Sequence, residues 1–291
     1  MYRYTNISFP SLGIDIDPIR EIAIGPLSVH LYGVMIALGL TLAVIYGCRR
    51  SKEFGLTEDH ILDGVLWVAP FAVLCARAYY CIFQWEELYA HRPLAVFYIW
   101  EGGLAIYGGV LGAVLGVFVL CRIKKISPFA LLDLVSIGFL IGQSIGRWGN
   151  FFNREAFGAE TDSFLRMGLL DPATGITTYH HPTFLYESIW NALGFLLLHK
   201  LSKKREYDGQ IALGYVVWYG LGRAFIEGLR TDSLYIPGTQ LRVSQVLAAV
   251  SCLAAVAVLV FFVLKPPAKP LFANRAAENP TENAEGGNED A

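Results

Sequence analysis

The chain has 291 residues, of which 54% are hydrophobic and only 16% charged, whereas an ordinary soluble domain carries about 25% charged residues. This composition excludes a disordered, collagenous or coiled-coil protein, and a formal net charge of −2 gives no basic surface for nucleic acid. The five cysteines form no C-x-x-C or Cys/His pattern, so neither a zinc site nor a disulfide framework is expected.

Seven stretches of about 20 mostly apolar residues predict membrane-spanning helices. In chain order they are Leu27–Cys48, Ile61–Phe83, Gly102–Cys121, Pro128–Asn150, Thr183–Leu201, Ile211–Leu229 and Val243–Leu264. Residues 1–26 lack the apolar segment of a cleaved signal peptide, so the first span is expected to be retained. The sequence therefore predicts an all-α, polytopic membrane helix bundle with seven transmembrane helices.

The basic residues of the connecting loops predict the orientation of these spans. One alternating set of loops holds 13 of the 23 Lys and Arg residues, the other set holds seven, and three fall inside spans. Because cytosolic loops carry the excess of positive charge, we expect the N-terminus outside and the C-terminus in the cytosol. Residues 1–264 then form the membrane domain, with residues 151–181 as a small extracytoplasmic head, and the Pro-, Asn- and Glu-rich residues 265–291 form a disordered cytosolic tail.

Seven Asp, Glu or Arg side chains fall inside the predicted spans, where a charge costs about 2.5–3.5 kcal/mol and marks function by default. Arg77, Arg147 and Arg223 share the outer half of their spans with Glu187 and Glu227. Three cations at one depth favour a polar chamber for an anionic ligand such as a phospholipid headgroup, because Arg binds phosphate in a bidentate manner. The alternative is a set of structural ion pairs, since Arg223 and Glu227 are four residues apart on one helix face.

Small residues in two spans have a packing interpretation. Gly142–Gly146 reads G-x-S-x-G, which on a strand–turn–helix would present a serine nucleophile. Inside an apolar helix, such residues instead favour close helix packing, and the same holds for Gly108, Gly109, Gly112 and Gly116. Two other functions stay open: an intramembrane protease would need a base beside Ser144, and a transporter should show internal repeats and broken helices.

The densest polar stretch is Gly146–Gly158, which reads GRWGNFFNREAFG. It closely resembles the signature G-R-x-G-N-F-x-N-x-E-x-x-G of bacterial prolipoprotein diacylglyceryl transferases. Five further stretches are similar to that family: HLYG at 30–33, ARAYY at 76–80, EGGLAIYGG at 101–109, HPTFLYE at 181–187 and YGLGRAFIEGLR at 219–230. The resemblance covers roughly residues 20–264.

This resemblance implies an activity and its partners. An enzyme of this family moves the diacylglyceryl group of phosphatidylglycerol to the thiol of the lipobox cysteine in a prolipoprotein signal peptide, so a thioether forms and glycerol 1-phosphate leaves. The reaction is the first step of lipoprotein maturation and takes place in the bacterial cell (inner) membrane. We expect no metal and no cofactor.

The same comparison, together with the depth of the arginines, gives the candidate site residues. The expected catalytic residues are Arg147, Arg223, Glu155 and Tyr107, and the expected phosphatidylglycerol-binding residues are Arg147, Asn150, Tyr32, Gly158, Glu227 and Arg77. The family often has His where this chain has Tyr107, and a free Tyr, with a pKa of about 10, is a poor base for a thiol of pKa about 8.5. We therefore expect the guanidinium groups to stabilise the leaving phosphate and to favour the thiolate, without a single strong base.

Overall fold

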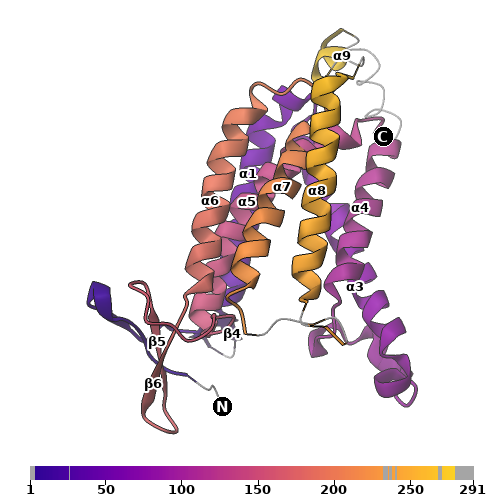
Figure 1. Cartoon of the computed structure of the whole chain (residues 1–291). Helices are drawn as coiled ribbons and strands as arrows, with labels where there is room; N and C mark the ends of the chain where they lie inside the picture. Colours follow the sequence, from indigo (N-terminus) through magenta and orange to yellow (C-terminus); the bar gives the residue numbers. More distant parts are fainter. Residues whose placement is uncertain are drawn as a thin grey trace. The chain divides into compact units, whose positions relative to one another are not determined.

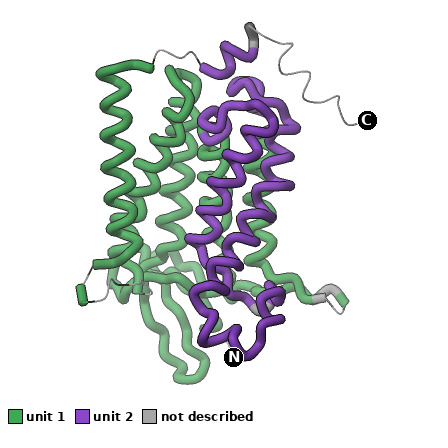
Figure 2. Tube along the Cα trace, turned by 90° about the vertical axis from the view of Figure 1, so that its right-hand side faces the viewer, with its two compact units in different colours: residues 1–46, 133–269 green, residues 47–132, 270–291 purple. Residues whose placement is uncertain are grey.

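The computed structural model describes residues 4–25, 27–231, 235, 238–239, 241–267 and 271–278, and most of these lie in helices (Figure 1). The chain divides into two compact units (Figure 2). Unit 1 comprises Met1–Tyr46 and Asp133–Lys269, and unit 2 comprises Gly47–Leu132 and Pro270–Ala291.

The long helices of unit 1 follow the predicted spans closely. They are α1 (Leu31–Arg50, whose end lies in unit 2), α5 (Pro128–Asn153, whose start lies in unit 2), α6 (Thr183–Ser202), α7 (Gln210–Glu227) and α8 (Val243–Leu264). The bounds of α8 agree with the prediction at both ends. The first span begins four residues late because Leu27–His30 forms a strand, β4, which pairs with β3 (Glu21–Ile24) in a hairpin.

Hydropathy supports membrane insertion for most of these helices. Within the described residues, five helical stretches are long and apolar enough to cross a membrane: Leu31–Phe54, Glu58–Phe83, Ile106–Ile123, Pro128–Asn153 and Val243–Leu264. Helices α6 and α7 form where they are predicted, but both carry buried polar side chains, such as Glu187 and Asn191 in α6 and Glu227 in α7. The chain is a mostly helical membrane protein, and the total of seven spans stays a prediction for α6 and α7.

The all-α class is wrong in one respect, because unit 1 also contains antiparallel sheets. One sheet has four strands in the order β2-β1-β5-β6: β1 (Ile7–Phe9), β2 (Ile14–Ile16), β5 (Met167–Asp171) and β6 (Ile176–His180). Each strand has only three to five residues, which is too short for an alternating pattern to stand out from the surrounding polar sequence.

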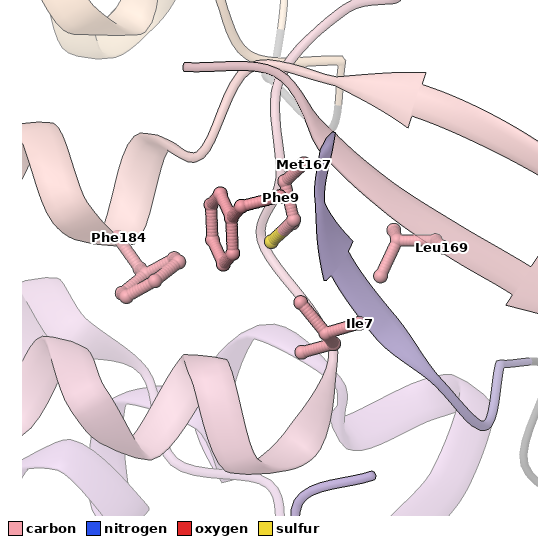
Figure 3. Close-up of a cluster of buried hydrophobic side chains, with 5 residues drawn as sticks. All are labelled: Ile7, Phe9, Met167, Leu169 and Phe184. Atoms are coloured by element: carbon pink, nitrogen blue, oxygen red, sulfur yellow. The ribbon is translucent and has the colours of Figure 1, made fainter. Parts of the chain in front are cut away.

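A small hydrophobic core joins this sheet to the beginning of α6. Figure 3 shows its five buried side chains: Ile7, Phe9, Met167, Leu169 and Phe184. Phe184 lies in the first turn of α6, so the sheet packs directly on the helix that carries Glu187. The predicted head segment 151–181 thus contributes a hairpin that the N-terminal strands extend, and its position outside the membrane stays a prediction.

Unit 2 is built on a close helix pair. The segments α2 (Glu58–Asp63), a π-helical turn η3 (Gly64–Val68) and α3 (Ala69–Phe83) run on continuously, and α4 (Ile106–Ile123) packs against α3. A Cβ added at Gly108 would lie 2.6 Å from the carbonyl oxygen of Cys75, and one added at Gly112 would lie 2.5 Å from the Cys75 Cβ. The packing interpretation of the α4 glycines is therefore confirmed.

Short helical segments complete the described chain: η1 (Pro10–Leu12), η2 (Ser51–Phe54), η4 (Trp85–Tyr89), η5 (Pro93–Phe97), η6 (Ile99–Glu101) and α9 (Phe272–Glu278). The prediction of a disordered tail is wrong at α9, which packs on η2 so closely that a Cβ added at Gly55 would lie 2.8 Å from the Cα of Ala273. Residues 268–270 and 279–291 of the predicted tail lie outside the described residues.

Two acidic residues near the predicted cytosolic ends of spans have structural roles. Asp133 of α5 accepts hydrogen bonds from the backbone N–H groups of Gly209 and Ala212, both at 2.8 Å, and so caps the beginning of α7. Asp63 forms an ion pair with Lys124 at 2.9 Å. Neither carboxylate is therefore needed to explain a functional site.

Candidate active site

Three helices of unit 1 contribute charged side chains to one cluster. Arg147 lies near the end of α5, Glu187 lies in the second turn of α6, and Arg223 and Glu227 lie in the last turns of α7. Arg230 follows α7 by three residues, and its backbone N–H still bonds to the carbonyl oxygen of Glu227 at 3.2 Å. Residues 223, 227 and 230 consequently face one side of the same helical segment. We call these five side chains the arginine cluster.

Glu187 is the common partner of the three arginines. Its Oε2 pairs with a terminal nitrogen of Arg147 at 2.5 Å, while its Oε1 lies 3.5 Å from Arg230 and 3.9 Å from Arg223. The Glu187 side chain is only 10% exposed. The two longer distances exceed a hydrogen bond, so these guanidinium groups are drawn together by charge more than they are fixed by hydrogen bonds to Glu187.

Glu227 supports the same arginines from the α7 side. Its carboxylate pairs with Arg223 at 2.8 Å, and it accepts a hydrogen bond from the Ser244 hydroxyl of α8 at 2.6 Å. Arg230 lies 3.9 Å from it. With three guanidinium groups and two carboxylates, the arginine cluster carries a formal charge of one positive unit and is suited to a monoanion.

A groove in unit 1 leads away from Arg147 between α1 and α5. Its volume is about 390 Å³, and it is lined by Tyr32, Ile36, Leu40, Ala43, Gly138, Phe139, Gly142, Gln143, Gly146, Arg147 and Asn150. Along α5 the lining extends from Gly138 to Asn150, which is twelve helical rises of 1.5 Å or about 18 Å. The polar residues Arg147, Asn150 and Tyr32 belong to one end of the two helices, and the lining is mainly apolar beyond them.

Small residues bring α1 and α5 together along this groove. A Cβ added at Gly149 would lie 2.7 Å from the ring of Tyr32, and one added at Gly39 would lie 3.1 Å from the carbonyl oxygen of Gly142. Tyr32 itself remains 37% exposed. The structure thus places Tyr32, Arg147 and Asn150 in the lining of one groove, and their expected binding of phosphatidylglycerol stays a prediction. Gly142 has the packing role that the sequence favoured.

The turn after α5 holds two residues in the left-handed region. Arg154 and Ala156 have φ values of 55° and 54°, which non-glycine residues adopt only when the surroundings enforce them. Thr183 donates its hydroxyl to the Ala156 carbonyl. The buried Arg154 side chain bonds to four groups: the carbonyl oxygens of Thr5, Phe152 and Pro18 and the carboxylate of Asp17. Arg154 therefore ties the N-terminal segment to the end of α5.

The predicted site residue Glu155 lies in this turn and is exposed. Its Oε1 accepts hydrogen bonds from Asn150 at 3.1 Å and from Asn153 at 3.2 Å. These contacts orient Asn150 at the groove opening. A catalytic role of Glu155 stays a prediction.

Gly158 ends the polar stretch 146–158 and contacts residues of two other stretches that resemble the family, 181–187 and 219–230. Its backbone N–H bonds to the His181 carbonyl at 2.9 Å, and it forms an antiparallel bridge with Arg230. A Cβ added at Gly158 would lie 2.8 Å from both the His181 Cβ and the Leu229 carbonyl oxygen. Gly158 is buried among protein atoms and its backbone pairs with that of Arg230. Its expected contact with phosphatidylglycerol stays a prediction.

The two histidines beside this junction differ. His180 is held by the Gly158 carbonyl at 3.0 Å and the Thr178 hydroxyl at 2.9 Å. The Nδ1 of His181 lies 3.3 Å from the Tyr186 hydroxyl, and burial lowers the pKa of His181 below its usual value. His181 is thus favoured in its neutral form.

Arg77 has a well-defined set of partners within unit 2. It is buried in unit 2, where its guanidinium group stacks over the Tyr89 ring at 5.4 Å. Its nitrogens donate to five backbone carbonyls, those of Ala95, Val96, Tyr98, Gly102 and Gly103. In this structure these donors fix the loop between α3 and α4, and the expected binding of phosphatidylglycerol by Arg77 stays a prediction.

Tyr107 also belongs to unit 2 and lies in the first turn of α4 with 42% of its surface exposed. Its proposed contribution to catalysis stays a prediction. Ser144, the possible nucleophile, donates to the backbone carbonyl of Ser188 at 2.9 Å, and its other neighbour is the Ser188 hydroxyl at 3.3 Å. Neither of these two groups could act as a base, so the protease alternative has no support in the described residues.

Two members of the arginine cluster were not among the expected site residues. From the sequence alone, Arg230 is an outer-loop cation and Glu187 is one acidic residue among several at the same depth. The spacing of Arg223, Glu227 and Arg230 at i, i+4 and i+7 is the signal that could have identified Arg230, because it extends one helix face beyond the predicted span.

The comparisons with known proteins show the family of the chain. The family model described as prolipoprotein diacylglyceryl transferase matches residues 20–261. Three relatives, each named phosphatidylglycerol–prolipoprotein diacylglyceryl transferase, are similar over most of their length. The Enterococcus faecalis protein is 44% identical over 240 residues (80% of this chain, 86% of the relative). The Halalkalibacterium halodurans protein is 42% identical over 241 residues (80% and 83%), and the Bacillus velezensis protein is 41% identical over 265 residues (88% and 97%). The chain belongs to the prolipoprotein diacylglyceryl transferase family.

Proposed function

We propose that the chain transfers the diacylglyceryl group of phosphatidylglycerol to the lipobox cysteine of a prolipoprotein. The names of its relatives state the lipid, the prolipoprotein and the diacylglyceryl transfer for those proteins. The observation that carries this proposal is the position of Arg147, which belongs both to the arginine cluster and to the lining of the groove. A phospholipid has the matching shape: its phosphate is anionic and its acyl chains are apolar.

The groove fits one leaflet of a bilayer. Its lining along α5 extends over about 18 Å, and the hydrocarbon core is about 30 Å thick in total. An acyl chain can therefore lie between α1 and α5 while the phosphate reaches Arg147 and the two other arginines. Asn150 and Tyr32 are placed to contact the glycerol backbone or the headgroup at the groove opening.

The transfer is a displacement at carbon. The cysteine sulfur bonds to the glyceryl CH2 that carries the phosphate ester, the C–O bond to phosphate breaks, and the S–H proton ends on the released glycerol 1-phosphate. Negative charge grows on the phosphate oxygens during this step. Arg147 and Arg223 are preorganised donors for that charge, and losing one such donor typically lowers the rate about 100- to 1,000-fold.

The carboxylates have a supporting role in this scheme. Glu187 and Glu227 hold the guanidinium groups in position before the substrate binds. When phosphate enters, it can replace the long contacts of Glu187 with Arg223 and Arg230, because neither is a hydrogen bond. The same positive field favours the thiolate form of the substrate cysteine.

The predicted setting of the enzyme follows from its loops. We propose a multi-pass protein of the bacterial cell membrane, with the N-terminus outside and the C-terminus cytosolic, because the loops on the proposed cytosolic side carry most of the Lys and Arg residues. The arginine cluster then lies near the outer leaflet.

A reconstitution experiment tests this function directly. The purified protein is incubated with phosphatidylglycerol vesicles and a lipobox peptide, and mass spectrometry measures the diacylglyceryl adduct of the peptide. We expect an adduct on the cysteine peptide and none on the Cys→Ser peptide. Failure to form the adduct with folded protein would reject the proposal.

A further inference from the structure

Two sets of reciprocal hydrogen bonds flank Glu187 on α6. On the α5 side, the Ser144 hydroxyl donates to the Ser188 carbonyl at 2.9 Å, and the Ser188 hydroxyl donates to the Ser144 carbonyl at 2.8 Å. The indole N–H of Trp148 also donates to the Ser188 hydroxyl at 3.2 Å. We call the Ser144–Ser188 pair the serine lock.

On the α7 side, two tryptophans repeat this arrangement. The indole N–H of Trp190 donates to the Trp218 carbonyl at 3.1 Å, and the indole N–H of Trp218 donates to the Trp190 carbonyl at 3.0 Å. Their rings stack at 4.4 Å with an interplanar angle of 19°. Each ring lies against a glycine of the opposite helix, Trp190 on Gly222 and Trp218 on Gly194. We call the Trp190–Trp218 pair the tryptophan lock.

On each helix, a residue of one or both locks lies within a few residues of a member of the arginine cluster. Ser188 follows Glu187 directly, and Trp190 is less than one turn further along α6. Ser144 precedes Arg147 by three residues, and the lock glycine Gly222 directly precedes Arg223. Helix α6 is therefore fixed to α5 and to α7 within about one turn of the carboxylate that the arginines share.

The reciprocal bonds make the locks sensitive to helix register. Each lock joins a side chain of one helix to the backbone of the other in both directions, so a slide of α6 by one residue, about 1.5 Å, would break both bonds of a pair. In an apolar surrounding, a hydroxyl or indole N–H that loses its partner finds no water to replace it. The locks thus hold Glu187 at a defined height relative to Arg147 and Arg223.

We propose that the serine lock and the tryptophan lock are positioning elements of the transfer reaction, which rests on the function proposed above. They act through Glu187 and set where the guanidinium groups point when charge develops on phosphate. Weakening either lock should lower kcat about tenfold and leave KM for phosphatidylglycerol within about threefold. The arginines can still bind a phosphate, but their arrangement around the transition state is lost.

Two conservative variants test the locks with matched controls. Ser188→Ala removes a hydroxyl of the serine lock, and its control is Ser251→Ala, whose hydroxyl bonds only within its own helix, to the Ala248 carbonyl at 3.1 Å. Trp218→Phe keeps an aromatic ring but removes the indole N–H, and its control is Trp67→Phe, a side chain that is 69% exposed. We expect the tenfold decrease in kcat in the two lock variants and less than a twofold change in kcat in the two controls. Thermal unfolding checks that all four variants are folded.

A double-mutant cycle separates positioning from general stability. If Ser188 acts through Glu187, then Ser188→Ala should cost less than about twofold in kcat when Glu187→Gln is already present. Ser188→Thr, which keeps a hydroxyl, should regain most of the activity. Losses that multiply in the double mutant, or lock variants with unchanged kcat, would overturn the positioning role. An inactive wild-type enzyme in the same assay would instead reject the proposed function.

Discussion

Replacing Arg147 by Lys tests whether the site needs a planar guanidinium group or only a positive charge. Among the described residues, Arg147 pairs with Glu187 alone, through one terminal nitrogen at 2.5 Å, and its side chain is 25% exposed toward the groove. The remaining N–H groups can bind two phosphate oxygens while the pair with Glu187 persists. A Lys ammonium has its three donors on one atom and cannot make both planar contacts at once.

The expected loss is that of one charge-assisted hydrogen bond in the transition state. Such a bond contributes about 1.5–3 kcal/mol, which at 1.36 kcal/mol per tenfold corresponds to a decrease in kcat/KM of about 10- to 150-fold. The assay is adduct formation on the lipobox peptide, measured over a range of phosphatidylglycerol concentrations. Arg49→Lys is the matched control, because Arg49 is exposed at the opposite end of α1. Near-full transfer by Arg147→Lys would show that bidentate phosphate binding at this position is not part of the mechanism.

Three further predictions concern packing, pH and charge. Gly108→Ala should lower the unfolding free energy by about 1–3 kcal/mol through overpacking. Gly109→Ala should be tolerated, because its added Cβ would lie 3.6 Å from the nearest atom. Thermal unfolding in detergent compares the two variants. Burial lowers the pKa of His181, so at mildly acidic pH the unfolded chain binds a proton at this residue that the folded protein does not. The difference in Tm between the wild type and His181→Gln should therefore decrease as the pH falls from about 7.5 to about 5.5. Glu187→Gln should strengthen inhibition by glycerol 1-phosphate by at least about tenfold, because the roughly 3 kcal/mol of one added positive charge at about 5 Å is reduced by salt screening. Unchanged inhibition would argue against a charge role for Glu187.

Helices were predictable from this sequence because membrane insertion requires long apolar stretches. Helix α8 agrees at both ends, and α5 continues beyond its predicted end at Asn150 to Asn153. The extension could not be read from hydropathy, because Phe151–Asn153 already mixes apolar and polar residues. The four-stranded sheet was missed for a different reason. Strands β1 and β2 precede the first span, β5 and β6 lie in the head segment after the fourth, and only their pairing in space identifies the sheet.

The candidate site was predictable in part because charges inside apolar spans are rare. This rule identified Arg147, Arg223 and Glu227, which the structure brings together with Glu187. Depth alone could not distinguish Arg77, whose partners are backbone carbonyls of a loop 18 to 26 residues further along the chain. Backbone carbonyls leave no trace in a charge pattern, so a structural arginine and a ligand-binding arginine look the same in the sequence.

The charge of the arginine cluster explains why an anion site contains two carboxylates. The phosphodiester of phosphatidylglycerol carries one negative charge, which matches the net charge of the cluster with Glu187 and Glu227 in place. The product is a phosphate monoester, which carries up to two negative charges because its second pKa is about 6. Without a carboxylate, an additional unit of positive charge at about 5 Å would hold that product more tightly by about 3 kcal/mol at an effective dielectric constant of about 20, before salt screening. Such retention would slow turnover more than it would help substrate binding. We infer that Glu187 and Glu227 keep the affinity of the site high enough to bind the substrate and low enough to release the product.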